Sequence, residues 1–152
     1  MNKSPLNFLI TIALGGILWV IIAIFYGGSF SESLMLATAT PEQFLGNLRV
    51  GLGVAAIIGI ANCLYWYYYG NLDSTVGDLN KAKRFWWISF IFQIIVSVVI
   101  LFVLVFVNLK EGILTSDWLI MFGLISLLSW FLFWLCTFLM SPRNVKFIPL
   151  FK

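Results

Sequence analysis

The stretch that decides the fold is TPEQFLGNLRVGLGVAAIIGIANCLYWYYY, which covers residues 40–69. Its first residues predict the start of a helix, because Thr40 suits the N-cap, Pro41 suits the first helical position and Gln43 stands three residues after the cap. From residue 50 to residue 69 no charged side chain interrupts the run. About twenty such residues are what an α-helix needs to cross the hydrocarbon core of a bilayer. The stretch therefore predicts a transmembrane helix.

Small residues recur every four positions within this run, at Gly51, Ala55, Gly59 and Cys63. Lipid tails solvate large apolar side chains as well as another helix does, so transmembrane helices associate where small residues let their backbones approach closely. We therefore expect a second helix to pack against this stripe. Residues 6–26 carry small residues around Gly16, so we expect the first helix to be that partner.

Four apolar runs organise the chain of 152 residues, of which 62% are hydrophobic and 10% charged. Soluble domains carry about 25% charged residues, so this composition indicates an integral membrane protein. The runs cover residues 6–26, 50–69, 85–107 and 118–140, and the second span is expected to begin near residue 45. The predicted fold is an all-α bundle of four transmembrane helices within residues 1–140, with short loops and a basic-aromatic tail at residues 141–152.

The distribution of Lys and Arg predicts the orientation of the bundle. Seven lie in flanks that share one side of the membrane: Lys3, Lys81, Lys83, Arg84, Arg143, Lys146 and Lys152. Only Arg49 and Lys110 lie on the other side. Because cytoplasmic flanks carry the excess of positive charge, both termini are expected in the cytoplasm, with a bacterial inner membrane as the expected location. We interpret the net charge of +3 through this topology and contact with membrane lipids, and not through nucleic-acid binding.

Two aromatic clusters end the second span and open the third, at residues 65–69 and 85–87. Amphipathic aromatic rings prefer the membrane–water interface, so both clusters are expected to form one belt at the cytoplasmic surface. Five consecutive aromatic residues cover every side of a helix, so they are not expected to line one pocket.

Polar side chains within the spans are few. Ser89, Gln93 and Ser97 recur every four residues in the third span, and Asn62 lies in the second. Polar groups in hydrocarbon tend to turn inward and pair, which predicts buried hydrogen bonds between helices. The same pattern would also line a narrow polar pathway or contact a substrate, so both interpretations remain open.

The tail at residues 141–152 combines basic and large apolar side chains. Pro142 stops the preceding helix, and Pro149 opposes the formation of another. The tail is interpreted either as an anchor in the membrane interface or as a peptide that docks on a cytoplasmic partner. The side chains that would make these contacts are Arg143, Lys146, Phe147, Ile148, Leu150 and Phe151.

Residues suited to catalysis are sparse in this chain. It contains no His, and no Asp, Glu or Lys lies inside an apolar run, so proton-coupled transport lacks its usual ionisable group at membrane depth. The two cysteines, Cys63 and Cys136, form no metal or redox motif by spacing, and we interpret them as packing residues that share a depth. We expect neither enzymatic activity nor a cofactor or metal.

Taken together, these features favour a non-enzymatic scaffold subunit of a larger envelope complex, such as a secretion, motor or transport machine. Its partners would be other membrane-protein subunits or further copies of itself. The alternative is a small channel, flippase or permease accessory for an uncharged or lipid-like substrate, lined by Asn62, Gln93, Ser97 and Ser126. A third hypothesis is a regulator that binds a cytoplasmic protein through the basic loop, in which case soluble binding would be sensitive to salt.

Overall fold

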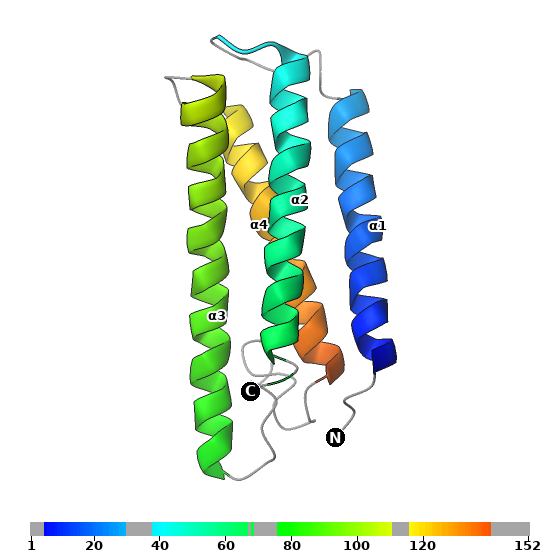
Figure 1. Ribbon diagram of the computed structural model, residues 1–152, viewed down its shortest axis with the longest axis vertical. Helices are drawn as coiled ribbons and strands as arrows, with labels where there is room; N and C mark the ends of the chain where they lie inside the picture. Colours follow the sequence, from blue (N-terminus) through cyan, green and yellow to red (C-terminus); the bar gives the residue numbers. More distant parts are fainter. Residues whose placement is uncertain (1–4, 30–37, 67, 69–75, 111–115, 141–152) are drawn as a thin grey trace.

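The computed structural model describes residues 5–29, 38–66, 68, 76–110 and 116–140 (Figure 1). These residues form four long helices, α1 Pro5–Ser29, α2 Pro41–Tyr65, α3 Val76–Phe102 and α4 Ser116–Met140, and a π-helical segment, η3 Val103–Leu109, which extends α3. Each of four segments is long and apolar enough to cross a membrane: Pro5–Phe25, Pro41–Tyr65, Lys83–Leu109 and Ser116–Leu139. The prediction of four apolar helices is confirmed, and they indicate a membrane protein.

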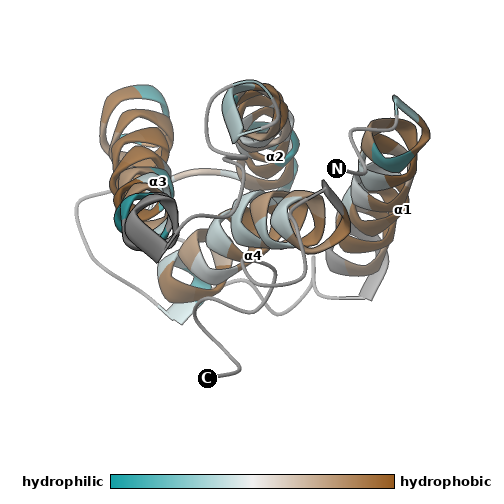
Figure 2. Ribbon diagram, turned by 90° about the horizontal axis from the view of Figure 1, so that it is seen from below, coloured by the Kyte–Doolittle hydropathy of each residue, from teal (hydrophilic) through white to brown (hydrophobic). Residues whose placement is uncertain are grey.

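The α2–α4 pair forms the most extensive helix contact, and α1 and α3 each pack against both of these helices. Seen end-on, α1, α2 and α3 lie in a row, with α4 on one side of it (Figure 2). In Figure 1, α4 passes behind α2 from beside α3 to beside α1. At the upper end Phe106 meets Trp118 edge to face, with ring centroids 4.8 Å apart. At the lower end Asn7 of α1 donates a 3.3 Å hydrogen bond to the carbonyl oxygen of Leu139.

The start of α2 follows its local sequence closely. Thr40 is in an extended conformation (φ −79°, ψ 153°) and caps the helix, with Pro41 in the first turn. The Gln43 backbone N–H donates to Thr40 Oγ1 over 3.3 Å, and the Thr40 N–H donates to Gln43 Oε1 over 3.2 Å. These reciprocal bonds form a capping box, which satisfies two backbone donors that have no partner within the helix. The expected helix start is therefore confirmed.

The small-residue stripe of α2 packs against α4 and the end of α3, so the expectation that α1 covers it is wrong. A Cβ atom added at Gly51 would lie 2.6 Å from Leu104 Cδ1 and 3.1 Å from Ile125 Cδ1. One added at Gly59 would lie 3.1 Å from Leu132 Cδ1, again on α4. Ala55 and Cys63 are also buried. Spacing identifies the face on which helices can approach, but it does not identify the helix that covers this face.

Helix α1 approaches α4 through Gly15, whose missing side chain makes room for Leu132. Gly16 is exposed and a Cβ added there would meet no atom within 4 Å, so it does not have the helix-packing place that we expected. Successive helical residues point about 100° apart, so only one of two adjacent glycines can face the bundle.

The aromatic clusters divide between the core and the surface of the bundle. Trp66 and Trp86 are only 1% and 3% exposed and pack around Phe133 of α4. Their ring centroids lie 6.0 Å and 5.6 Å from that of Phe133. Tyr65 and Trp87, the chain neighbours of these tryptophans, are exposed. Of the six described rings, two therefore belong to the core of the bundle, and the belt at the membrane surface stays a prediction for the exposed rings.

The two cysteines share a depth, as expected. Cys63 Sγ lies 3.4 Å from the carbonyl oxygen of Leu132, and Cys136 Sγ lies 3.6 Å from that of Cys63. Both side chains are fully buried and neither is in a disulfide. They pack α2 against α4 at the Cys63 end of the small-residue stripe.

Candidate functional site

The polar line of α3 is buried: Ser89, Gln93 and Ser97 are 6%, 2% and 1% exposed. Gln93 Oε1 accepts a 2.8 Å hydrogen bond from Ser129 Oγ, which joins α3 to α4. Ser97 Oγ donates instead to the carbonyl oxygen of Gln93 in its own helix, over 2.9 Å. Gln93 and Ser97 therefore face α4, and Gln93 holds an interhelical bond there.

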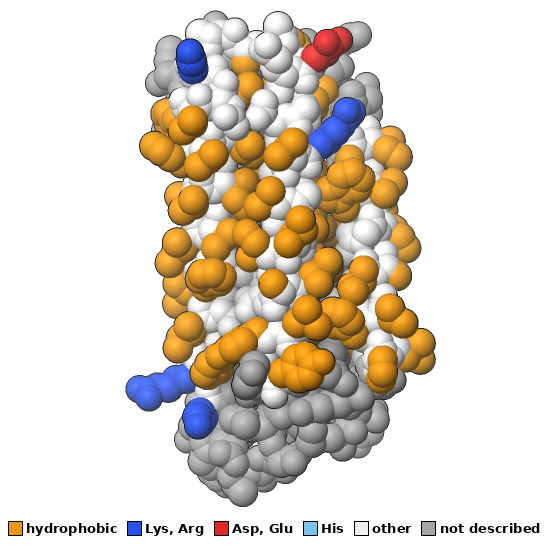
Figure 3. All heavy atoms as spheres, in the orientation of Figure 1, with side chains coloured by type: hydrophobic (Ala, Val, Ile, Leu, Met, Phe, Trp, Pro, Cys, Tyr) orange, Lys and Arg blue, Asp and Glu red, His pale blue; other side chains and the backbone are white. Residues whose placement is uncertain are grey.

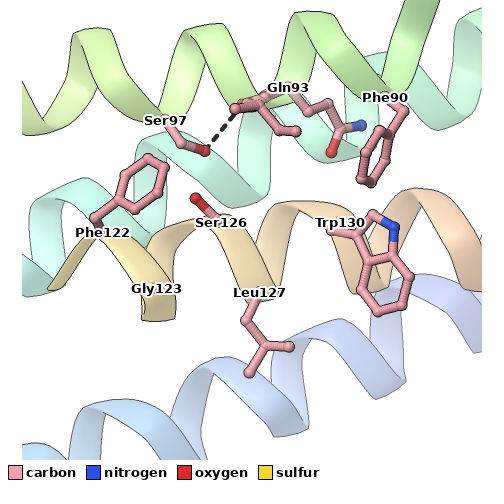
Figure 4. Close-up of a pocket in the computed structure, with 9 residues that line it drawn as sticks. Phe90, Gln93, Ser97, Phe122, Gly123, Ser126, Leu127 and Trp130 are labelled. Atoms are coloured by element: carbon pink, nitrogen blue, oxygen red, sulfur yellow. Dashed lines mark hydrogen bonds between the residues drawn. The ribbon is translucent and has the colours of Figure 1, made fainter. Parts of the chain in front are cut away.

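A groove of about 340 Å³ lies between α3 and α4 (Figure 4). Ile94, Gly123 and Leu127 of its lining are exposed, so the groove reaches the outer surface of the bundle. Its polar lining comes from Gln93, Ser97 and Ser126. The remaining lining residues are apolar: Phe90, Ile94, Phe122, Gly123, Leu127 and Trp130. We call this the α3–α4 groove.

Two polar atoms in the α3–α4 groove lack hydrogen-bond partners among the described residues. They are Gln93 Nε2 and Ser126 Oγ, and both are buried. In Figure 4 the Gln93 amide and the Ser126 hydroxyl point into the space between the two helices. Gly123 is exposed beside them, and a Cβ added there would meet no atom within 4 Å. The groove thus combines unused hydrogen-bonding capacity with room for another backbone.

A second groove, of about 540 Å³, lies between α2 and α3. Its lining is largely apolar and includes Asn62 and Ser89; the other lining residues are Ile57, Ile58, Ala61, Tyr65, Phe85, Ile88 and Phe92. Within the described part of the chain, Asn62 Nδ2 is buried and has no hydrogen-bond partner. Tyr65 stacks on Phe85 at one end, with ring centroids 5.5 Å apart. We call this the α2–α3 groove.

A third hollow, of about 500 Å³, lies at the Lys110 end of the bundle and has a polar lining. The polar residues around it are Thr38, Gln43, Asn47, Asn108 and Lys110. Thr38 Oγ1 donates to the carbonyl oxygen of Leu109, and Asn47 Nδ2 donates to that of Gln43. Lys110 ends η3 in a left-handed conformation with φ 53°. This end of the bundle suits contact with water and lipid head groups.

The sequence interpretation brought Asn62 and Gln93 together as one lining, but the structure separates them into two grooves on opposite flanks of α3. It gave no role to Gly123 or to Ser129, the partner of Gln93. A sequence signal for them does exist, since Gly123, Ser126 and Ser129 recur every three residues and so share one face of α4. The expected docking tail, with Arg143, Lys146, Phe147, Ile148, Leu150 and Phe151, lies outside the described residues.

Searches of protein-family models, of curated proteins and of solved structures found no match to this chain. Within the described segments, no group of three or more His, Cys, Asp and Glu side chains is placed to hold a metal ion. The function is therefore argued from the two grooves that flank α3.

Proposed function

We propose that this protein is a non-enzymatic scaffold subunit of a larger envelope complex, such as a secretion, motor or transport machine. We further propose that a transmembrane helix of a partner subunit occupies the α3–α4 groove. The observation that supports this best is the buried Gln93 Nε2, which has no acceptor among the described residues. The bacterial inner membrane, with both termini in the cytoplasm, is part of the same proposal.

The depth of Gln93 favours a protein occupant over a lipid. Gln93 follows Phe85 by eight residues, which is about 12 Å along the helix. Phe85 lies next to the basic end of α3, so Gln93 lies well inside the hydrocarbon layer, where acyl chains offer no hydrogen-bond acceptor. An unsatisfied buried donor costs about 1–3 kcal/mol. A hydroxyl, amide or backbone carbonyl group of a partner helix would accept from Gln93 Nε2 at this depth.

The shape of the α3–α4 groove also favours a helix. Gly123 leaves open space at the surface, so a second backbone can approach α4 closely. Phe90 and Trp130 lie at the opposite end of the groove and offer large surfaces for dispersion contacts, with their ring centroids 6.5 Å apart (Figure 4). The lining holds no acid, base or thiol, which supports a binding role over a catalytic one.

Substitution of Gly123 tests the proposal. Gly123→Leu places a large side chain in the groove, and Gly16→Leu is the matched control, because both glycines are exposed, helical and free of neighbours within 4 Å. Affinity purification in mild detergent should recover a stoichiometric foreign subunit with the wild type and with Gly16→Leu, but not with Gly123→Leu. Recovery of the same subunit with Gly123→Leu would contradict the proposed docking site.

The second candidate function is a channel, flippase or permease accessory for an uncharged or lipid-like substrate. One observation favours it, because both grooves lie beside polar side chains: Gln93, Ser97 and Ser126 in one and Asn62 in the other. Reconstitution into liposomes with a labelled lipid discriminates the two candidates. A transporter would move the lipid and lose this activity in Asn62→Leu or Gln93→Leu, whereas a scaffold would show no transport alone.

A further inference from the structure

We propose that the α2–α3 groove binds one anionic, ester-linked phospholipid from the leaflet at the Lys81 end of α3. One acyl chain would lie in the groove, an ester carbonyl would accept from Asn62 Nδ2, and the phosphate would meet Lys81 and Arg84. This site is distinct from the α3–α4 groove and does not depend on the scaffold proposal.

The body of the groove suits an acyl chain. Its walls are formed by Ile57, Ile58 and Ala61 of α2 and by Ile88 and Phe92 of α3. The space measures about 540 Å³, and Ile57, Ile88 and Phe92 along it are exposed, so a chain can enter from the bilayer without leaving the hydrocarbon. Figure 3 shows that hydrophobic side chains cover this face of the bundle between basic side chains at its two ends. An acyl chain would thus replace lipid contacts that this surface must make in any case.

The unpartnered amide of Asn62 lies where a phospholipid carries its ester groups. Asn62 precedes Tyr65 by three residues, and Ser89 follows Phe85 by four, so both lie about 5–6 Å along their helices from the stacked Tyr65–Phe85 pair. Exposed aromatic rings mark the level of the lipid head groups. A donor about one helical turn below that level meets the glycerol ester region, where a carbonyl oxygen is available to accept from Nδ2.

Positive charge continues the same face of α3 beyond the groove. Lys81 and Arg84 each stand four residues before a groove residue, Phe85 and Ile88, and so share that face. Both side chains are exposed, and Lys83 between them is partly exposed. Basic side chains at a membrane surface attract anionic head groups by about 1 kcal/mol each. Along this face, the apolar groove comes first, then the Asn62 donor, and then the cations. An anionic phospholipid has its acyl chain, its ester groups and its phosphate in the same order.

The α3–α4 groove lacks this arrangement, which makes the assignment specific. Its unpartnered donor on Gln93 lies about 12 Å from Phe85 along α3, beyond the level of ester groups. No Lys or Arg stands three or four residues before a lining residue of that groove, on either α3 or α4. A phospholipid would therefore leave Gln93 unsatisfied but would satisfy Asn62.

Native mass spectrometry of the purified full chain tests the proposal with three lipids of identical acyl length. These are ester-linked phosphatidylglycerol, its ether-linked analogue without carbonyl groups, and ester-linked phosphatidylcholine. The wild type should bind the ester-linked anionic lipid about fivefold better than the ether analogue, as expected for one membrane hydrogen bond of about 1 kcal/mol. It should also prefer phosphatidylglycerol over phosphatidylcholine, by about fivefold for each basic residue engaged.

Two sets of variants should lose different preferences. Asn62→Leu should abolish the ester-over-ether preference and keep the preference for the anionic lipid. The double variant Lys81→Gln and Arg84→Gln should lose the preference for the anionic lipid and keep the ester-over-ether preference. Gln93→Leu and Arg49→Gln, at the other groove and the other end of the bundle, should change neither. Equal binding of ester and ether lipids to the wild type, which requires no variant to fold, would overturn the proposal, as would an undiminished ester preference in Asn62→Leu.

Discussion

Ser129 Oγ of α4 donates a 2.8 Å hydrogen bond to Gln93 Oε1, the side-chain amide oxygen of a buried residue of α3. The amide nitrogen of the same side chain, Nε2, has no hydrogen-bond partner in the described part of the chain. The bond fixes the Gln93 side chain against α4, beside the groove that we propose for a partner helix. Among the described residues, the side-chain amide of Gln93 therefore uses its oxygen but neither of its two N–H donors.

Removal of the Ser129 hydroxyl should weaken the bundle. Ser129→Ala leaves Gln93 Oε1 without its donor, and we expect the free energy of unfolding to fall by about 1 kcal/mol, as is typical of a hydrogen bond between membrane helices. Ser126→Ala is the control, because Ser126 Oγ has no partner among the described residues and should change stability little. Unfolding by sodium dodecyl sulfate in mixed micelles measures the free energy of unfolding of both variants. Equal losses in the two variants would contradict this role of Ser129.

Two neighbouring glycines of α2, one inside the small-residue stripe and one outside it, should tolerate substitution unevenly. At Gly51→Ala the new Cβ would lie 2.6 Å from Leu104 Cδ1 and 3.1 Å from Ile125 Cδ1, so we expect a loss of about 1–3 kcal/mol from overpacking. At Gly53→Ala the new atom would meet nothing within 4 Å, so little change is expected. The same unfolding assay compares them. A larger loss at Gly53 than at Gly51 would mean that α4 does not cover the stripe as described.

The orientation of the bundle can be tested with two single-cysteine proteins, after Cys63 and Cys136 are replaced by Ala. We predict that Asn108→Cys reacts with a membrane-impermeant maleimide added to intact cells, because the Lys110 end carries few basic residues. Lys81→Cys should react only after the membrane is permeabilised, because the basic flanks stay in the cytoplasm. Both side chains are exposed in the structure. The reverse labelling pattern would place both termini outside.

Deletion of residues 141–152 tests the two interpretations of the tail, as an anchor in the membrane interface or as a peptide that docks on a cytoplasmic partner of the proposed scaffold. Truncation after Met140 should abolish co-purification of that partner while the shortened protein still enters the membrane. The double variant Arg143→Gln and Lys146→Gln removes two positive charges and keeps the apolar side chains of the tail. If the tail is an interfacial anchor, this change should weaken its attraction to lipid head groups. Unchanged co-purification after truncation would remove the tail from the proposal.

Local signals were sufficient to predict the helices. The capping box joins Thr40 and Gln43, which are three residues apart, so no knowledge of the tertiary structure was needed. Long apolar runs likewise indicate spans without reference to their neighbours. The burial of Gln93 was predictable as well, because a polar side chain in hydrocarbon turns inward.

Which helix packs against which depends on how each helix is rotated about its axis and on where the helices cross. Sequence patterns do not encode either of these directly. Tyr65 is exposed and Trp66 is buried, although both are amphipathic aromatic residues in adjacent positions. Gly15 packs against α4 while Gly16 does not. The two grooves lie on different flanks of α3, one against α4 and one against α2. The sequence could therefore identify polar residues inside the spans, but it could not assign them to two separate sites.

Photo-crosslinking in living cells tests the central claim most directly. A benzoylphenylalanine at position 94 would project from the α3–α4 groove, whereas one at position 95 provides the control. Ile94 and Ile95 are both exposed, at 40% and 55%, but only Ile94 lines the groove. The account predicts an adduct with one foreign membrane protein from position 94 and none from position 95. Lipid adducts alone, equal protein adducts from both positions, or an adduct of twice the chain's own mass would contradict it.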